Sequence, residues 1–216
     1  MFVSDWMTSE VFTVMPDDSI ARAANLMKER NIRHLPVVRG TELVALLSDR
    51  DLKEFSPSKA TTLDIYELHY LFEKTKVKDV ARMKPLTTTA DTPIEEAAML
   101  MHDAAIGCLP VLDTHEQLVG IITYKDMYKV LVDITGARSK GARVSLLLSD
   151  TPGSIKEAAD IIRSFGLQLR SILTSYERSQ EGVRHVVIRT KRKEGLDVEA
   201  LKKQLSVLDP NVKVKS

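Results

Sequence analysis

LVALLSDRDL at residues 43–52 and LVGIITYKDM at residues 118–127 are two versions of one stretch, 75 residues apart, and they decide the fold. Each begins with a mainly apolar run and continues into a hydroxyl residue, with an aspartate three positions later. A short apolar run that leads into a polar, acidic segment is typical of a buried strand followed by a helix. We therefore expect the same strand and helix to occur twice.

The repeat extends upstream of these stretches. There the offset is 74 residues, because the turn DTHEQ of the second copy is one residue longer than RGTE of the first. The matched pairs include Val3 with Val77, Thr13 with Thr87, Ile20 with Ile94, Met27 with Met101 and Pro36 with Pro110. So many matches in the same order predict two copies of one unit, at about 3–55 and 77–132.

Each copy has the pattern of a strand, a helix, two strands and a second helix. Polar residues at 17–19 and 91–93 precede apolar residues with helical spacing, which is typical of a capped amphipathic helix. The two later strands are expected at 34–38 and 43–47 in the first copy and at 108–112 and 118–122 in the second, with second helices from Asp49 and Tyr124. The segment between the copies, 57–76, is expected to become helical from about Leu63.

A hydroxyl and a carboxylate follow the last strand of each copy at the same spacing. Ser48 precedes Asp51 by three residues, and Thr123 precedes Asp126 by three. In a first helical turn this spacing places both groups on one face, beside exposed N–H groups, where they suit a phosphate and ribose hydroxyls. The alternative is that Ser48 and Thr123 only cap their helices and the aspartates complement the helix dipole.

The tandem motifs NIRHLPVV with LVALLSDRD, and AIGCLPVL with LVGIITYKD, resemble a pair of CBS domains, or Bateman module, over residues 1–135. The resemblance implies an α/β fold with two related clefts that bind ATP, ADP, AMP or S-adenosylmethionine. Asp51 and Asp126 would accept the ribose hydroxyls, and Ser48 and Thr123 would lie beside the phosphates. The other residues that it places at the clefts are Thr13, Arg33, His34, Pro36, Arg50, Thr87, Gly107, Pro110 and Lys125.

The two clefts are expected to differ in charge. The first copy offers Arg33, His34 and Arg50, where the second copy has Ile106, Gly107 and Lys125. The greater positive charge predicts that a multiply charged phosphate prefers the cleft of the first copy. For Arg33 and His34 the alternative is an exposed pair at the start of a strand.

Composition limits the classes of function. The 216 residues contain 31 Lys plus Arg and 30 Asp plus Glu, a balance that disfavours nucleic acid as a partner. Apolar runs are short and no signal peptide is evident, so we expect a cytoplasmic protein without a membrane span. With one cysteine, Cys108, and scattered histidines, neither a disulfide nor a metal site is expected.

The composition changes after residue 135. The stretch TGARSKGAR at 135–143 predicts a flexible junction, assigned to 136–141. Residues 142–216 carry a net charge of +5, which leaves −4 for residues 1–141. Strands at 143–149, 167–176, 183–190 and 211–215 and helices at 154–165 and 197–205 give the order βαββαβ, which is the ferredoxin-like arrangement.

Within this segment DTPGSI at 150–155, followed by FGLQL at 165–169, resembles the ACT domain, a small-molecule sensor. The resemblance implies an amino-acid site at Asp150, Pro152, Gly153, Ser154, Ile155 and Gln168. Gln168 departs from the asparagine that is frequent in the family. The alternative is a dimerising domain without a ligand.

Two CBS-like repeats and an ACT-like domain together resemble the layout of the acetoin-utilisation (AcuB) family. We expect a non-catalytic regulatory protein, a homodimer that binds an adenine nucleotide and controls an unidentified metabolic partner protein. The alternatives are an enzyme that acts on a nucleotide through Asp51, Asp126 and His34, and a dimerisation scaffold with empty clefts.

Overall fold

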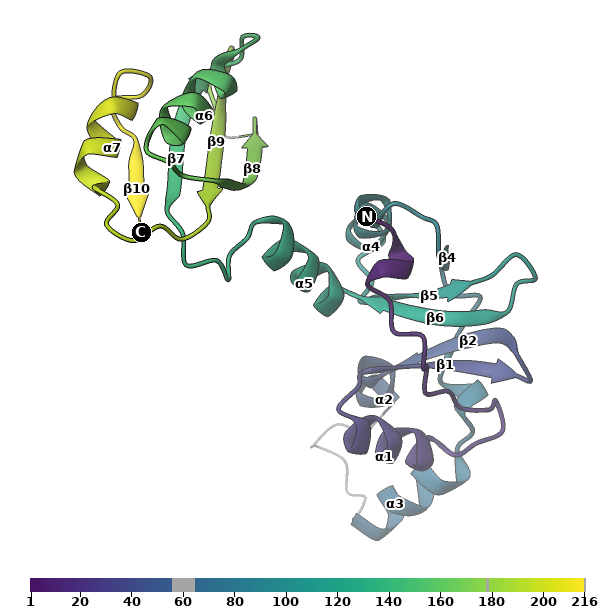
Figure 1. Ribbon diagram of the computed structural model, residues 1–216. Coiled ribbons are helices and arrows are strands. Elements are labelled where there is room, and N and C mark those ends of the chain that lie inside the picture. The colour runs from purple at the N-terminus through teal and green to yellow at the C-terminus, as the bar shows by residue number, and fades with distance from the viewer. Residues whose placement is uncertain (56–64, 178, 216) are drawn as a thin grey trace. The chain divides into compact units, whose positions relative to one another are not determined.

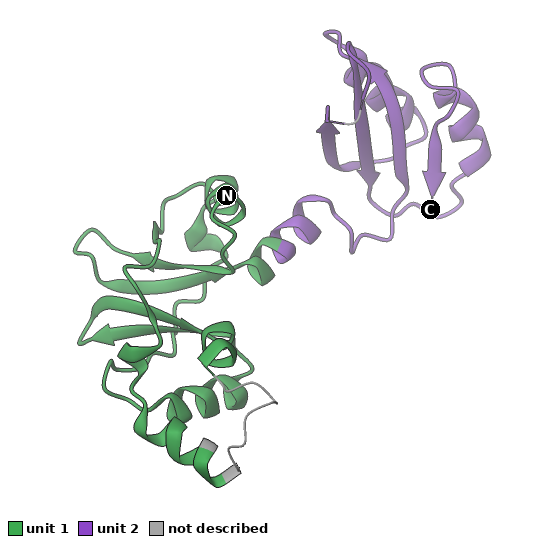
Figure 2. Cartoon of the chain, turned by 180° about the vertical axis from the view of Figure 1, so that it is seen from behind, with its two compact units in different colours: residues 1–127 green, residues 128–216 purple. Residues whose placement is uncertain are grey.

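The computed structural model describes residues 1–55, 65–177 and 179–215. The chain forms two compact units, Met1–Met127 and Tyr128–Ser216 (Figures 1 and 2). The first unit contains both copies of the repeat up to the first turn of helix α5 (Tyr124–Ile134), and the second unit begins within that helix. The fold is of the mixed α/β class that the sequence predicts.

The first copy folds around a short antiparallel sheet. Its elements are α1 (Ile20–Arg30), β1 (His34–Arg39), β2 (Glu42–Ser48) and α2 (Asp49–Phe55). The hydroxyl of Ser19 accepts the N–H of Arg22, which fixes the start of α1. Asn31 ends the helix with a left-handed φ of 51°. The apolar faces of these elements form one buried cluster, which includes Ile20, Met27, Leu35 and Leu47.

The second copy repeats this arrangement. Its elements are η2 (Val77–Asp79), β4 (Thr88–Thr89), α4 (Ile94–Asp103), β5 (Cys108–Leu112), β6 (Leu118–Thr123) and α5. The first strand expected in each copy is very short. It is the two-residue β4 here, parallel to β5, and a single bridge between Val14 and Val37 in the first copy.

The leading segments of the two copies are exchanged. Strand β3 (Arg82–Met83), in the leading segment of the second copy, pairs with β2 of the first, so that Arg82 lies opposite Leu46. Thr8, in the leading segment of the first copy, lies opposite Ile121 of β6. Val77 likewise packs into the buried cluster of the first copy. Neither β3 nor this exchange is predicted from the local patterns of the sequence.

Helix α3 (Ile65–Lys74) connects the two copies in the sequence and packs on α1 of the first copy. Its Phe72 meets Phe55 edge-to-face at a centroid separation of 6.1 Å. The predicted loop before the helix and its expected start at Leu63 lie outside the described residues.

The second unit has the predicted order βαββαβ. Its elements are β7 (Arg143–Ser149), α6 (Ser154–Ser164), β8 (Leu169–Ser175), β9 (Val183–Thr190), α7 (Val198–Leu205) and β10 (Lys213–Lys215). The strands form one antiparallel sheet in the order β10-β7-β9-β8, which is ferredoxin-like. The second and last strands begin two residues later than expected.

Alternate residues of β7 and β9, such as Leu146 and Ile188, are buried against Ile162 of α6 and Leu201 of α7. This cluster is separate from that of the first copy, so the second unit has a core of its own. None of the described helices is long and apolar enough to cross a bilayer.

Candidate functional site

A cavity of about 500 Å³ lies in the first unit where the two copies meet. The first copy contributes His34 and the end of β2 with the start of α2. The second copy contributes residues 82–86, residues 105–108 and Tyr124. Because the leading segments are exchanged, each copy supplies one part of the wall.

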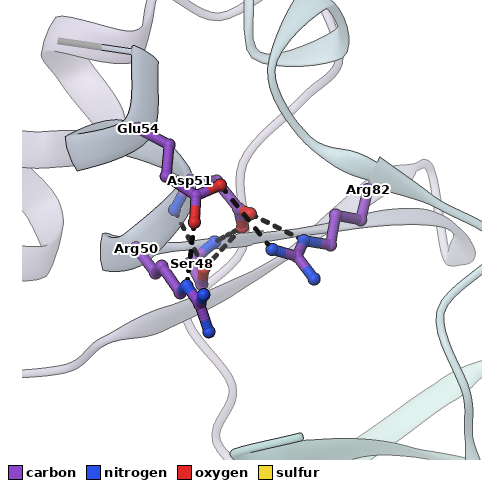
Figure 3. A network of polar contacts seen from close by, with 5 residues as sticks. All are labelled: Ser48, Arg50, Asp51, Glu54 and Arg82. Atoms are coloured by element: carbon purple, nitrogen blue, oxygen red, sulfur yellow. Dashed lines mark hydrogen bonds and ion pairs between the residues drawn. The ribbon is translucent and has the colours of Figure 1, made fainter.

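Ser48 and Asp51 form a reciprocal pair at the edge of this cavity (Figure 3). The Asp51 Oδ2 atom accepts the Ser48 N–H at 2.8 Å and the Ser48 hydroxyl at 2.5 Å. The Asp51 N–H donates to Ser48 Oγ at 3.2 Å. This is the capping arrangement that the sequence analysis keeps as an alternative. It holds the Asp51 carboxylate at the cavity in a fixed orientation.

Arg82 completes the contacts of this carboxylate (Figure 3). Its Nε atom lies 2.7 Å from Asp51 Oδ1, and its Nη2 atom lies 4.0 Å from Glu54 Oε2. Burial acts to raise the pKa of Asp51, but hydrogen bonds from Ser48 and Arg82 outweigh it and lower the pKa below its usual value. Asp51 is thus a buried, ionised acceptor, with 6% of its side chain exposed.

The second copy builds the same pair. Asp126 Oδ2 accepts the Thr123 N–H at 3.0 Å and the Thr123 hydroxyl at 2.8 Å. Asp126 is also buried. Both predicted pairs therefore exist as local structures.

Gly107 lies between two rings in the cavity wall. A Cβ atom at this position would lie 2.8 Å from Cε1 of Tyr124 and 3.0 Å from the ring of His34. A side chain here would displace one of the rings, so the close approach of the two copies at this point depends on glycine.

Burial lowers the pKa of His34, and Arg33 lowers it further, while Asp49 and Asp51 oppose this effect. The unfolded chain therefore binds a proton at His34 more readily than the folded chain does. We expect the free energy of unfolding to fall as the pH drops below about 6.5, towards the lower pKa of the folded state. His34→Gln should flatten this dependence in urea titrations between pH 7 and pH 5.5.

The wild type titrated under the same conditions is the reference for this prediction. An unchanged slope in His34→Gln would contradict the assignment.

Cys108 also lines the cavity. Burial raises the pKa of its thiol to about 12, so the thiolate, which is the nucleophilic form, is scarce at neutral pH. In the described part of the chain no group of three or more metal-ligating side chains occurs.

Five residues predicted for the clefts line the cavity: His34, Ser48, Arg50, Asp51 and Gly107. The other predicted residues are not part of its lining: Thr13, Arg33, Pro36, Thr87, Pro110, Thr123, Lys125 and Asp126. Pro36 and Pro110 lie within β1 and β5 and pair with Leu46 and Ile121.

Sequence reasoning missed the segment 82–86 and Tyr124. Arg82 and Lys84 are the cations of this segment, and they come from the second copy. The sequence signal for these cations is the short basic stretch RMKP at 82–85, just before Thr87. It belongs to the second copy, and only the exchange of segments brings it to a cavity beside Asp51.

At the predicted amino-acid site in the second unit, the structure adds Arg184. Its guanidinium lies 3.3 Å from Asp150 Oδ1 and donates to Ser154 Oγ at 2.8 Å. Gly153 precedes α6 with a left-handed φ of 96°. Ile155 packs against the core of the unit, and the carbonyl of Gln168 accepts the N–H of Lys191. The role of these residues in binding an amino acid stays a prediction.

Comparison with known proteins identifies the first unit. Residues 3–58 and 77–133 match the family model of the CBS domain, which covers more than half of the chain. Inosine-5'-monophosphate dehydrogenase of Methanocaldococcus jannaschii is 31% identical over 157 residues, which are 72% of this chain and 28% of that enzyme. The chain therefore spans less than a third of the length of this relative.

Two solved structures are similar to the same region. A putative acetoin utilization protein (AcuB) from Vibrio cholerae is 28% identical with a TM-score of 0.54, over 64% of this chain and 95% of that chain. CBSX2 in complex with AMP is 27% identical with a TM-score of 0.53, over 62% of this chain and 97% of that chain.

Proposed function

The chain belongs to the CBS-domain family, and on that premise we propose that it is a regulatory protein that binds an adenine nucleotide. The nucleotide occupies the cavity beside Asp51, shifts a conformational equilibrium and thereby controls a metabolic partner protein. Such a shift requires that the ligand bind one conformation more tightly than the other.

The observation that carries this proposal is the buried Asp51 carboxylate in a cavity with three cations, Arg50, Arg82 and Lys84. A carboxylate accepts hydrogen bonds from ribose hydroxyls, and cations pair with phosphates. A cavity of about 500 Å³ is also in the range of small-molecule sites. The complex of CBSX2 with AMP supports the same class of ligand.

The finer parts of the proposal concern the partner and the second unit. Similarity to the AcuB structure over 95% of that chain supports a role in acetoin utilisation. The ferredoxin-like second unit acts as an ACT-like domain that binds an amino acid beside Arg184 and Ser154. The protein works as a homodimer, which light scattering after size-exclusion chromatography tests.

Calorimetry of the full chain with AMP, ADP, ATP and S-adenosylmethionine tests the nucleotide proposal. We expect at least one of the phosphorylated nucleotides to bind in the micromolar range, because a regulatory ligand must bind reversibly. The products of each incubation are analysed by chromatography. No binding of any nucleotide, or turnover of one by the protein alone, would contradict the proposal.

A further inference from the structure

Arg82 blocks the acceptor that the ribose needs. Asp51 Oδ2 already accepts two hydrogen bonds from Ser48, and Oδ1 accepts the Arg82 Nε–H at 2.7 Å. A carboxylate oxygen has about two lone pairs. A ribose that donates two hydroxyls to this carboxylate therefore has to take the place of Arg82.

Arg82 is free to move when this happens. Its side chain is 60% exposed, whereas that of Asp51 is 6% exposed. Its second carboxylate, Glu54, is 4.0 Å away and is also paired with Arg50 at 2.8 Å. Once displaced from Asp51, the guanidinium remains at the cavity, where an anionic group of the ligand is its natural partner.

The position equivalent to Arg82 in the other copy holds a threonine. Thr8 lies opposite Ile121 in the same register as Arg82 opposite Leu46, so the two positions are structurally equivalent. Two residues further on, Glu10 takes the place of Lys84. The positions are thus matched while the charges differ, because Thr8 and Glu10 stand where the other segment has Arg82 and Lys84.

We infer that Arg82 is a specificity-determining residue, which exchanges Asp51 for the ligand phosphate and so selects phosphorylated adenosine ligands over uncharged or cationic ones. The inference rests on the proposed function, in which the nucleotide ribose binds Asp51. AMP supplies both partners, a ribose for Asp51 and a phosphate for Arg82. Adenosine supplies the ribose and leaves Arg82 without an anion, whereas S-adenosylmethionine, which is cationic overall, has only the carboxylate of its methionine chain in place of the phosphate.

Calorimetry with AMP, adenosine and S-adenosylmethionine on the wild type and on Arg82→Gln tests this exchange. Because AMP loses a charged partner in the variant, its affinity should fall about tenfold. Because adenosine no longer has to displace an ion pair, its affinity should rise roughly two- to fivefold, the range for exposed ion pairs. Opposite changes for two ligands cannot arise from a general disturbance of the cavity.

Lys84→Gln is the matched control. It removes a cation from the same segment, but Lys84 is not one of the groups that act on the Asp51 carboxylate. The affinity for AMP should fall by a smaller factor than in Arg82→Gln, and the affinity for adenosine should not change. If Arg82→Gln lowers the affinities for AMP and adenosine by the same factor, or changes neither affinity, the inference is wrong while the proposed function stands. If the wild type binds none of the three ligands, the inference is overturned, and the proposed function is overturned with it only if ADP and ATP also fail to bind.

Discussion

Asp51→Ala is expected to lower the affinity for AMP at the cavity by about 100-fold, because it removes two hydrogen bonds to a charged acceptor. The fixed orientation of the carboxylate makes this loss larger than that of an exposed aspartate would be, since Asp51 is held by Ser48 before the ligand arrives. Calorimetric titration of AMP into the variant measures the effect.

The same substitution removes the bonds that Asp51 Oδ2 accepts from Ser48 at the start of α2, and it should cost about 1 kcal/mol of stability. Asp126→Ala is the matched control, because it breaks the equivalent bonds to Thr123 and should cost a similar amount. It should leave the AMP site beside Asp51 intact. Wild-type affinity for AMP in Asp51→Ala would show that the ribose does not bind this carboxylate.

Local patterns are sufficient to predict most of the secondary structure. The second helices begin at Asp49 and Tyr124 as expected, and Ser19 caps α1, because apolar spacing and capping residues act within a few positions. The ferredoxin-like order of the second unit follows from the same kind of signal. The bounds of β5, β7 and β9 are as expected, whereas those of the other predicted strands differ by one or two residues at an end, since they depend on pairing with distant strands.

The exchange of leading segments is the part that local patterns do not contain. Strand β3 is two residues long and has no apolar alternation, and only its pairing with β2 defines it. This pairing brings Arg82 to Asp51, 31 residues away in the sequence. Arg33, one of the cations predicted for the first cleft, is not part of the cavity lining, whereas Arg50, Arg82 and Lys84 are. The difference in charge between the two clefts stays a prediction.

Residues 136–141 are a second segment in which a contact with a distant strand is not evident from the local sequence. The glycines and basic residues there predict a flexible junction, and the structure instead holds part of it against β9. Ser139 Oγ donates to the carbonyl of Thr190, and the N–H of Ala142 donates to the Thr190 hydroxyl. Composition indicates low propensity for regular structure, and it does not reveal that another strand binds the segment.

A Cβ atom at Gly141 would lie 1.9 Å from the carbonyl oxygen of Thr190, where β9 ends. Because this neighbour is backbone and cannot move aside as a side chain does, Gly141→Ala is expected to destabilise the second unit by about 3 kcal/mol or more. Hydrogen exchange of the full chain, followed by mass spectrometry, should show faster exchange in β7 and β9. Trp6, the one tryptophan, lies in the first unit, so its fluorescence transition in urea should stay unchanged.

Gly182→Ala separates the clash from the general cost of replacing a glycine in this unit. Gly182 has a φ of 77°, and a Cβ atom there would meet nothing within 4 Å. Its replacement should therefore cost roughly 1 kcal/mol, the penalty of a left-handed residue. Equal exchange rates in the two variants would mean that the contact of Gly141 with Thr190 contributes nothing of its own. A larger effect in Gly141→Ala, confined to the second unit, would place the start of that unit's fold before β7, within the segment that the composition alone assigns to a linker.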